Sequence, residues 1–429
     1  MIVIDDTEVR RTRPAKVAFA SFVGTAIEWY DFFIFGTAAA LVFGVAFFPS
    51  LSPLSGTLAA FATFGVAFIS RPAGAIVFGH FGDRIGRKKM LVLSLVLMGS
   101  ATVMIGLIPT YDQIGVAAPV LLVAARLVQG FAVGGEWGGA VLMAVEHAPA
   151  KKRAFYGSFP QAGVPAGLVL ASLAFLLVER LPEDQVMAWG WRIPFLASAL
   201  LVAVGLYVRF KLAESPEFEE VRRNKRVADF PIVNVLRDQR RALAVGILTQ
   251  ATSLVPFYLV TVFVLSYGPK ELGLSRQTIL LSLLVACVFD IFSVPFASMV
   301  ADRIGPRRML IYGSVYMAAI AYPFFWLLTT GNGWAVLLAM VLIITVGHAV
   351  TYSAVAAYVS SLFPADVRYT GASVAYQFGG VVFSAPAPFI AVALSSATEG
   401  QWALAAYVAA ACAITFLVLT TSKTAKVSR

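Results

Sequence analysis

The chain contains few of the residues on which catalytic and cross-linked proteins depend. It has two cysteines and three histidines among 429 residues, and charged side chains make up only 13% of it. Cys287 and Cys412 both lie in apolar runs, which excludes a disulfide framework and a cysteine-based zinc site. With only His80, His147 and His348 available, metal catalysis is not expected. The strings H-E-x-x-H, G-x-S-x-G and a P-loop lysine are also absent, so neither an embedded enzyme nor an ATP-driven machine is favoured.

Apolar sequence, in contrast, is abundant. Hydrophobic residues make up 59% of the chain, and a soluble domain would carry about 25% charged residues. Runs long enough to cross a bilayer, about 20 residues, recur near residues 17–47, 55–81, 90–109, 117–145, 155–178, 191–212, 242–267, 277–301, 308–329, 334–362, 370–394 and 401–421. The sequence therefore predicts an all-α membrane protein with twelve transmembrane helices in two six-helix bundles.

The polar stretches divide the chain further. We expect an N-terminal tail at 1–16, a first bundle at 17–212, a basic linker at 213–241, a second bundle at 242–421 and a C-terminal tail at 422–429. If the N-terminus lies inside, most of the 33 Lys and Arg residues fall in the tails, the linker and the inner loops. This bias predicts that both termini are cytoplasmic in a bacterial inner membrane. The net charge of +10 then reflects topology and contact with anionic lipid, with no nucleic-acid partner.

One signature occurs twice. Residues 83–86 and 302–305 both read Asp-Arg-Ile-Gly, each followed by a basic cluster, and the similar strings 149–153 and 364–368 follow at a similar interval. Such a repeat indicates two pseudo-symmetric halves. In membrane transporters built this way the substrate site lies at the interface between halves. Six plus six spans fit rocking of two halves better than a channel or a sensor.

Two motifs resemble those of the major facilitator superfamily. The string Gly79-x-x-x-Asp83-Arg84-x-Gly86-Arg87-Lys88 resembles its loop signature between the second and third helices. The string Arg126-Leu-Val-Gln129-Gly130 resembles the arginine motif of its fourth helix. Within the superfamily, the chain resembles the metabolite:proton symporter family, whose members carry shikimate, α-ketoglutarate, citrate or proline and betaine. The strings at 28–32, 71–74, 129–138 and 190–195 support this through the first half, and 302–303, 307–308 and 376–377 more loosely in the second.

The resemblance implies a secondary active transporter that works by alternating access. Its partners would be protons, as the coupling ion in place of any cofactor, and a small organic acid or zwitterion, with a shikimate-like monocarboxylate favoured. We expect a monomer in the lipid bilayer. The alternative of the same fold is a proton-coupled efflux antiporter. Its fifth-helix signature has Gly-Pro followed by paired glycines, from which the string at 163–167 departs.

Two carboxylates in the first span are candidates for proton coupling. Glu28 and Asp31 share one helix face, where ionised groups are expensive and two neighbours resist simultaneous ionisation. The alternative is a structural ion pair or a cap around an unwound turn. Arg126 lies at a compatible depth and needs a carboxylate partner, which Asp31, Glu28 or Glu136 could supply. The resemblance assigns this arginine to coupling; a permanent structural pair is the competing interpretation.

Arginines in the spans are candidates for binding a substrate carboxylate, because a guanidinium binds it at two points. The resemblance associates Arg71 and Arg192 with this role. Beside Trp189 and Trp191, Arg192 could instead be an interfacial anchor. Further substrate-binding candidates are Tyr30, Gln129, Tyr258, His348, Tyr376 and Gln377.

One polar residue of the second half falls outside the family pattern. Asp290 could tune substrate choice, pair with a cation or line water. For His348 a hydrogen bond to a neighbouring helix is favoured slightly over a role in carrying protons.

Residues of the repeated loops are expected to act as gates. The gating candidates are Gly79, Asp83, Arg84, Gly86, Arg87, Asp302 and Arg303. The Asp83 carboxylate can cap the positive N-terminus of a neighbouring helix, plausibly the eleventh, and this latch must break in the opposite state. We expect Asp302 to be its weaker counterpart, because Ser298 replaces the glycine of the first motif and Pro306 is inserted.

Overall fold

The computed structural model describes residues 13–224, 230–398 and 401–422, and within these ranges all regular structure is helical. Twelve segments of this part of the chain are long and apolar enough to cross a membrane, which confirms the expected fold. Of the expected tails, residues 1–12 and 423–429 lie outside the described ranges.

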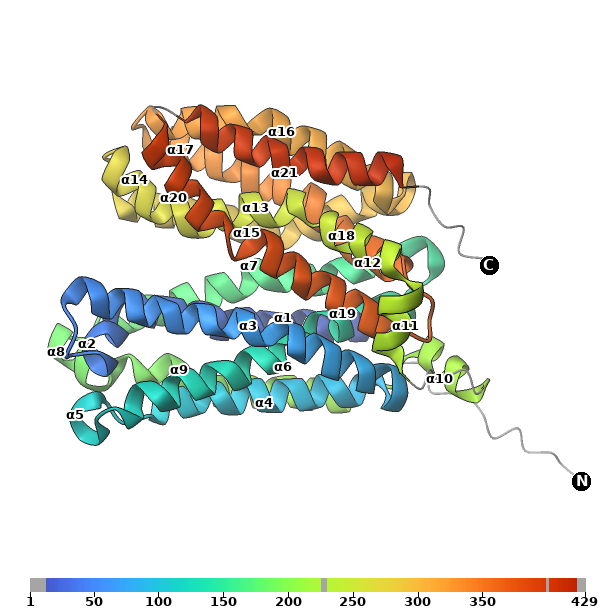
Figure 1. Cartoon of the computed structure of the whole chain (residues 1–429), viewed down its shortest axis with the longest axis horizontal. Helices are drawn as coiled ribbons and strands as arrows, with labels where there is room; N and C mark the ends of the chain where they lie inside the picture. Colours follow the sequence, from blue (N-terminus) through green and yellow to red (C-terminus); the bar gives the residue numbers. More distant parts are fainter. Residues whose placement is uncertain (1–12, 225–229, 399–400, 423–429) are drawn as a thin grey trace, which may run out of the picture.

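The first half lies on the lower side of Figure 1 and contains six spans. The first span is interrupted by a π-helical turn. The elements are α1 (Pro14–Ala38), η1 (Ala39–Phe43), α2 (Gly44–Phe47), α3 (Pro53–Ile85), α4 (Arg87–Leu107), α5 (Tyr111–Ile114), α6 (Ala117–His147), η2 (Ala150–Lys152), α7 (Arg153–Val178), α8 (Glu183–Gln185), η3 (Val186–Gly190) and α9 (Arg192–Phe210).

Two short amphipathic helices, α10 (Pro216–Arg223) and α11 (Pro231–Asp238), follow in the expected linker and lie at one end of the bundle (Figure 1). We call this end the α10 end. The second half comprises α12 (Arg240–Leu248), α13 (Ala251–Tyr258), η4 (Leu259–Phe263), α14 (Val264–Glu271), α15 (Arg276–Ile304), α16 (Pro306–Thr329), α17 (Gly333–Met340), η5 (Val341–His348), α18 (Ala349–Ser361), α19 (Arg368–Gly379), η6 (Gly380–Ser384), α20 (Ala387–Ala397) and α21 (Trp402–Thr421).

The repeated signature has a clear structural reason. Gly86 ends α3 and begins α4 with a φ of 116°, and Gly305 ends α15 and begins α16 with a φ of 94°. Side chains with a Cβ rarely adopt this region of backbone conformation, whereas glycine does so without strain. Each signature therefore marks the same sharp reversal between two spans.

Glycines also bring α3 against α6 in the first half. A Cβ on Gly74 would lie 1.9 Å from the carbonyl oxygen of Phe131, and one on Gly134 would lie 2.2 Å from that of Arg71. Only hydrogen at these positions allows the two backbones to approach this closely. The contact places the Arg71 side chain beside the polar face of α6.

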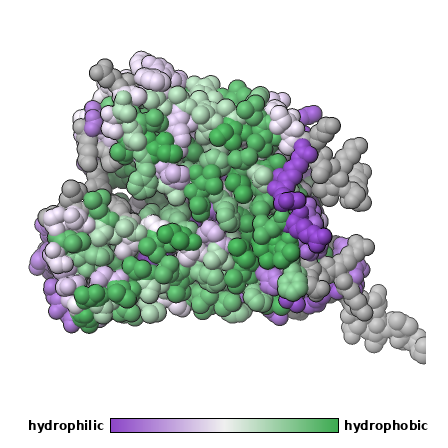
Figure 2. Space-filling model, in the orientation of Figure 1, coloured by the Kyte–Doolittle hydropathy of each residue, from purple (hydrophilic) through white to green (hydrophobic). Residues whose placement is uncertain are grey.

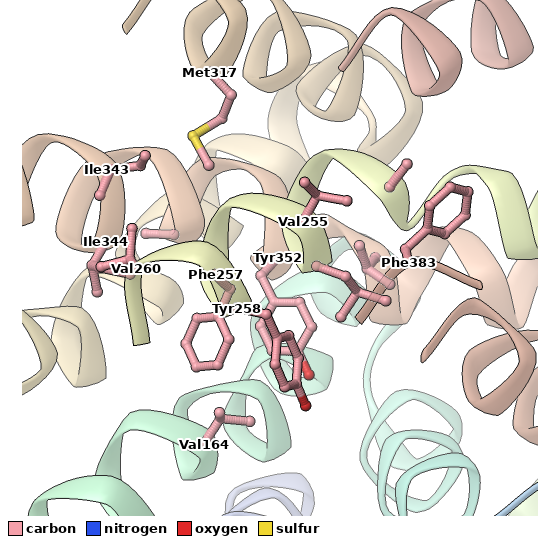
Figure 3. Packing of buried hydrophobic residues seen from close by; sticks show 14 of the residues in the cluster. Val164, Val255, Phe257, Tyr258, Val260, Met317, Ile343, Ile344, Tyr352 and Phe383 are labelled. Atoms are coloured by element: carbon pink, nitrogen blue, oxygen red, sulfur yellow. The ribbon is translucent and has the colours of Figure 1, made fainter. Parts of the chain in front are cut away.

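The lateral surface is apolar, and the hydrophilic residues gather at the two ends (Figure 2). Phe292, Phe296 and Leu200 are exposed by about 70%, as expected for residues that face lipid. Figure 2 also shows that the surface is hollowed between the two halves at the end opposite the α10 end. Elsewhere one apolar cluster joins the halves: Val164 of α7 packs with Phe257 and Tyr352 of the second half (Figure 3).

Candidate functional site

A small polar cavity lies inside the first half, next to the interface with the second. Its volume is about 10 Å³, and its lining includes Glu28, Arg71, Arg126 and Gln129 from α1, α3 and α6. That volume is enough for about one water molecule. All four side chains are buried, and Glu28 Oε2 and Arg71 Nε have no hydrogen-bond partner within the described chain. Unpartnered polar atoms of this kind indicate a site that water or a ligand completes.

Asp31 lies one turn further along α1 and is completely buried. Its two oxygens each accept one hydrogen bond, from the hydroxyl of Thr102 on α4 and from the hydroxyl of Ser198 on α9, both at 2.7 Å. Both donors are neutral, and no cation of the described chain forms an ion pair with this carboxyl.

Arg126 has no direct carboxylate partner among the described residues, so the expected ion pair is not present. Its guanidinium donates to the side-chain oxygen of Gln129 and to the carbonyl oxygen of Phe64, and it stacks 3.9 Å from the ring of Phe35. The amide of Gln129 then donates to Thr102 at 2.8 Å. The arginine therefore reaches Asp31 through two intervening side chains.

Glu136 is paired with a residue that the sequence did not point to. Its carboxylate accepts hydrogen bonds from Arg209 of α9 and from Ser94 at 2.7 Å. The pair is almost completely buried. The guanidinium of Arg209 occupies the space that a Cβ on Gly24 would fill. A long polar residue near the end of an apolar span is the signal that could have identified it.

Arg71 is held between aromatic rings. Its guanidinium carbon lies 4.4 Å from the ring centroid of Phe68 and 5.2 Å from that of Phe32. Across the interface, the ring of Phe68 lies 6.4 Å, between centroids, from the ring of Tyr258 on α13. Arg71 is thus a buried cation that connects the cavity to the second half. Much of its guanidinium group remains available to an anion.

The second half contributes an aromatic and amide wall. The Tyr352 and Tyr376 hydroxyls lie 2.6 Å apart, and Tyr376 stacks on Trp137 of α6 with ring centroids 3.9 Å apart and an interplanar angle of 4°. Figure 3 shows the hydroxyls of Tyr258 and Tyr352 directed toward the first half. Gln377 donates to carbonyl oxygens of Val133 and Gly134 at 3.4 Å, so it belongs to the interface.

Two candidates lie away from this cluster. Arg192 donates to the carbonyl oxygens of Gly106 and Ile108 at 2.7 Å, where it caps the C-terminus of α4, and it stacks on Trp191. Tyr30 donates to the carbonyl oxygen of Pro194 at 2.8 Å inside the first half. The structure does not bring either residue to the central cavity.

The halves are joined at the α10 end by two aspartates in equivalent positions. Asp83 of α3 accepts from the backbone N–H groups of Tyr369 and Thr370, at 3.1 and 2.8 Å, and from the Thr370 hydroxyl at 2.8 Å. It therefore caps the N-terminus of α19, the eleventh span. Gly79 makes this approach feasible, because a Cβ there would lie 2.7 Å from Thr370 Cα.

Asp302 of α15 makes the matching contact with α7. It accepts from the backbone N–H groups of Ala154 and Phe155 at 2.8 and 2.9 Å. Asp302 is half-buried, whereas Asp83 is buried, and a cavity of about 650 Å³ borders the Asp302 contact. Arg84 and Arg303 are exposed and take no part in either cap.

A network of charges reinforces the α10 end. Arg87 forms a fully buried pair with Glu146 of α6, and Glu146 also accepts from Arg368 of α19 at 3.2 Å. Arg368 in turn pairs with Glu217 of α10. Burial alone would raise the pKa of the Glu217 carboxyl, but Arg368 and Arg153 outweigh it and hold this pKa below its usual range.

The linker adds a carboxylate to this network. Glu214 accepts from the backbone N–H groups of Arg87 and Lys88, at 3.1 and 3.2 Å, at the start of α4. Glu146, Glu214 and Glu217 were not identified from the sequence, although the Glu-Ser-Pro-Glu string directly after the sixth span is a usable signal. In the described chain, the hydrogen bonds between halves lie at mid-depth or at the α10 end. This end is therefore closed.

Two similar six-span halves with a polar cavity beside their interface are the architecture of a membrane transporter built from repeats. The model of the Major Facilitator Superfamily matches residues 21–388. The chain belongs to this superfamily; it is a secondary transporter and not an enzyme.

The relatives cover about nine-tenths of the chain or more. The chain is 43% identical over 410 residues to the inner membrane metabolite transport protein YhjE of Escherichia coli K12, covering 94% of this chain and 93% of that protein. It is 41% identical to the shikimate transporter of the same strain, covering 96% and 94%. It is 33% identical to the proline/betaine transporter of that strain, covering 89% and 77%.

A solved structure shares the fold. The proton:xylose symporter XylE bound to 6-bromo-6-deoxy-D-glucose has a TM-score of 0.75 at 17% identity, covering 95% of this chain and 94% of that one.

Proposed function

We propose that the protein is a proton-coupled symporter that imports a small organic acid or zwitterionic metabolite by alternating access, with a shikimate-like monocarboxylate as the favoured substrate. The central observation is the buried cluster of Glu28, Asp31, Arg71 and Arg126 beside the interface. It combines sites that can gain or lose a proton with a guanidinium whose Nε is unpartnered. The names of the relatives support the substrate class.

Arg71 is the residue that would bind the substrate carboxylate. It is buried and pinned by two phenylalanine rings, so its fork is pre-organised for a planar anion. The hydroxyls of Tyr258, Tyr352 and Tyr376 lie opposite and would donate to substrate hydroxyl or carboxylate oxygens. A cavity of about 10 Å³ is far smaller than the hundreds of Å³ that a ligand site needs. Binding therefore requires the halves to separate at the end opposite the α10 end.

Protonation of Glu28 or Asp31 would favour substrate loading. It would also favour the conformational change that carries the loaded site to the inside. Proton entry neutralises a buried carboxylate, and the cationic fork of Arg71 then attracts the substrate anion without competition from Glu28. Basic residues gather at the α10 end, so this end would be cytoplasmic by the positive-inside rule. The structure would then be the state closed to the cytoplasm, in a bacterial inner membrane.

Uptake into proteoliposomes tests the proposal. Radiolabelled shikimate, a dicarboxylate and a betaine are compared, each with and without an inward proton gradient. We expect accumulation of one substrate class that collapses with a protonophore and is indifferent to sodium. Accumulation that survives the protonophore and requires sodium would contradict proton symport.

A further inference from the structure

The second half contains a buried acid–base pair that no part of the proposed cycle uses. Asp290 of α15 is completely buried, and its Oδ2 lies 2.8 Å from Nδ1 of His348, the last residue of η5. The other oxygen, Oδ1, is enclosed and has no hydrogen-bond partner within the described chain. The imidazole and the carboxylate thus form a buried hydrogen-bonded pair that can share one proton.

The surroundings of the pair favour a net charge of zero. Among the described residues, the titratable groups placed against it are Cys287, three residues before Asp290 on α15, and Tyr352 of α18, whose ring stacks on His348. No lysine or arginine of the described chain forms an ion pair with Asp290. A bare Asp290 anion with a neutral histidine would leave one uncompensated negative charge in an apolar setting, which is costly. One added proton, shared between imidazole and carboxyl, removes that charge.

The pair also has contact with the transport pathway. The ring of His348 is stacked between the rings of Phe257 and Tyr352. The distances between ring centroids are 4.8 Å to Phe257 and 4.6 Å to Tyr352. Phe257 packs on Trp29 of the first half, and the hydroxyl of Tyr352 is hydrogen-bonded to that of Tyr376. The second ring nitrogen, Nε2, has no hydrogen-bond partner in the described chain and is not among its enclosed unpartnered atoms. Nε2 is therefore the nitrogen at which a proton could join the pair.

The pair ends a π-helical segment of eight residues, Val341–His348. Such segments are rare in helices and are found preferentially at functional sites. Within this segment, Thr345 and His348 both hydrogen-bond to α15. The pair is thus one of two hydrogen-bonded contacts between η5 and α15.

We propose that Asp290 and His348 form a second proton-binding site of the carrier, located in the half opposite Glu28 and Asp31. This inference rests on the proposed proton symport. The step is a simple protonation: one proton from water on the outer side joins the His–Asp pair, changing its net charge from −1 to 0, and leaves to water on the cytoplasmic side. Each cycle then moves one proton more than the first-half carboxylates alone would move.

The test is the number of protons moved per substrate, measured from the membrane potential at which net flux through the reconstituted carrier is zero. For Asp290→Asn and His348→Gln we expect the proton-to-substrate ratio to fall by one relative to the wild type. In the double variant the ratio should fall by the same amount, because the two residues hold one proton together. Counterflow exchange at equal pH should persist in all three.

A matched variant separates proton binding from helix packing. Thr345 of η5 donates to the carbonyl oxygen of Ala286 on α15 at 2.9 Å, so it joins the same two elements without a titratable group. Thr345→Val should leave the ratio unchanged. If the two pair variants are too unstable to reconstitute, protons taken up on substrate binding in detergent give the same count.

The outcomes are distinguishable. An unchanged ratio in the active pair variants, or an equal fall in Thr345→Val, would overturn the second site while leaving proton symport intact. A wild-type carrier whose flux ignores the proton gradient would overturn the proposed function itself.

Discussion

Arg126 and Asp31 are joined through two polar side chains and not through a direct ion pair. Arg126 donates to Gln129, Gln129 to Thr102, and Thr102 to Asp31. A direct pair between full charges would hold the carboxylate permanently ionised. A relay of neutral groups lets the charge of the arginine act on Asp31 only weakly, which is what the proposed proton coupling through Asp31 requires.

Replacing Asp31 with Asn should abolish proton-driven accumulation and retain part of substrate exchange at equal pH. Asn keeps the shape and can still accept from Thr102 or Ser198, but it cannot bind and release a proton. Uptake with and without a pH gradient in proteoliposomes measures this. Asp112→Asn, at an exposed position in α5, is the control and should accumulate substrate normally. If Asp31→Asn accumulates substrate like the wild type, coupling belongs to Glu28.

The relay can be cut at its centre with Thr102→Val and restored with Thr102→Ser. The valine removes a hydrogen bond to a buried carboxyl, worth about 1.5–3 kcal/mol, so we expect at least a tenfold loss of proton-driven uptake. The serine should retain most of it. Thr37→Val removes a hydroxyl that bonds only to Phe33 of its own helix and should have little effect. Equal activity in the valine and serine variants would show that the relay has no role.

Arg71→Lys should weaken substrate binding although the charge is kept. A lysine ammonium cannot reproduce the two-point contact of a guanidinium, and the lost bond corresponds to roughly a tenfold to hundredfold rise in Kd. Calorimetric titration of the detergent-purified protein separates binding from transport. Arg192→Lys is the control and should change Kd less than twofold, because Arg192 caps α4. Unchanged affinity with lost transport would assign Arg71 to the conformational cycle.

The two aspartate caps should differ in strength. Asp83→Asn weakens three hydrogen bonds to the start of α19, and Asp302→Asn weakens two at a more exposed contact. We therefore expect Asp83→Asn to open the α10 end more. Distances between spin labels at the exposed positions Arg84 and Arg308 report the opening, and both native cysteines are buried. A larger shift in Asp302→Asn would reverse this ranking.

Acid should weaken the contact of α10 with α19. Because the pKa of Glu217 is lowered in the folded protein, its ionised form stabilises the fold above the ordinary carboxyl pKa of 4.5. That stability is lost as the pH falls through the lowered value. The melting temperature of Glu217→Gln should lie below that of the wild type at pH 7, and the gap should close at acid pH. A gap independent of pH would assign the effect to packing.

Sequence and structure agree where the information is local. The length of the apolar runs predicts the spans, and the glycine of each Asp-Arg-Ile-Gly string predicts a reversal that needs a positive φ. Depth within a span also follows from residue position. The direction around the helix axis does not, because it depends on how neighbouring helices rotate to pack.

This explains which residues of the site were missed. Arg126 has the depth of Asp31 but reaches it only through α4, and no spacing in the sequence reveals Thr102 as the connection. Arg209 lies near the end of the sixth apolar run, and nothing in its spacing shows that it turns inward to Glu136. Asp290 and His348 are 58 residues apart, and only the packing of their spans brings them together.

At the α10 end, α3 has glycines where it packs against the start of α19. A Cβ on Gly82 would lie 1.9 Å from the ring of Tyr369, just as one on Gly79 would meet Thr370. The seal at the α10 end thus depends on the missing side chains of Gly79 and Gly82, which leave room for the start of α19. A methyl group added at either position would push α3 and α19 apart. We therefore expect closure of this end to depend on residues that carry no functional group.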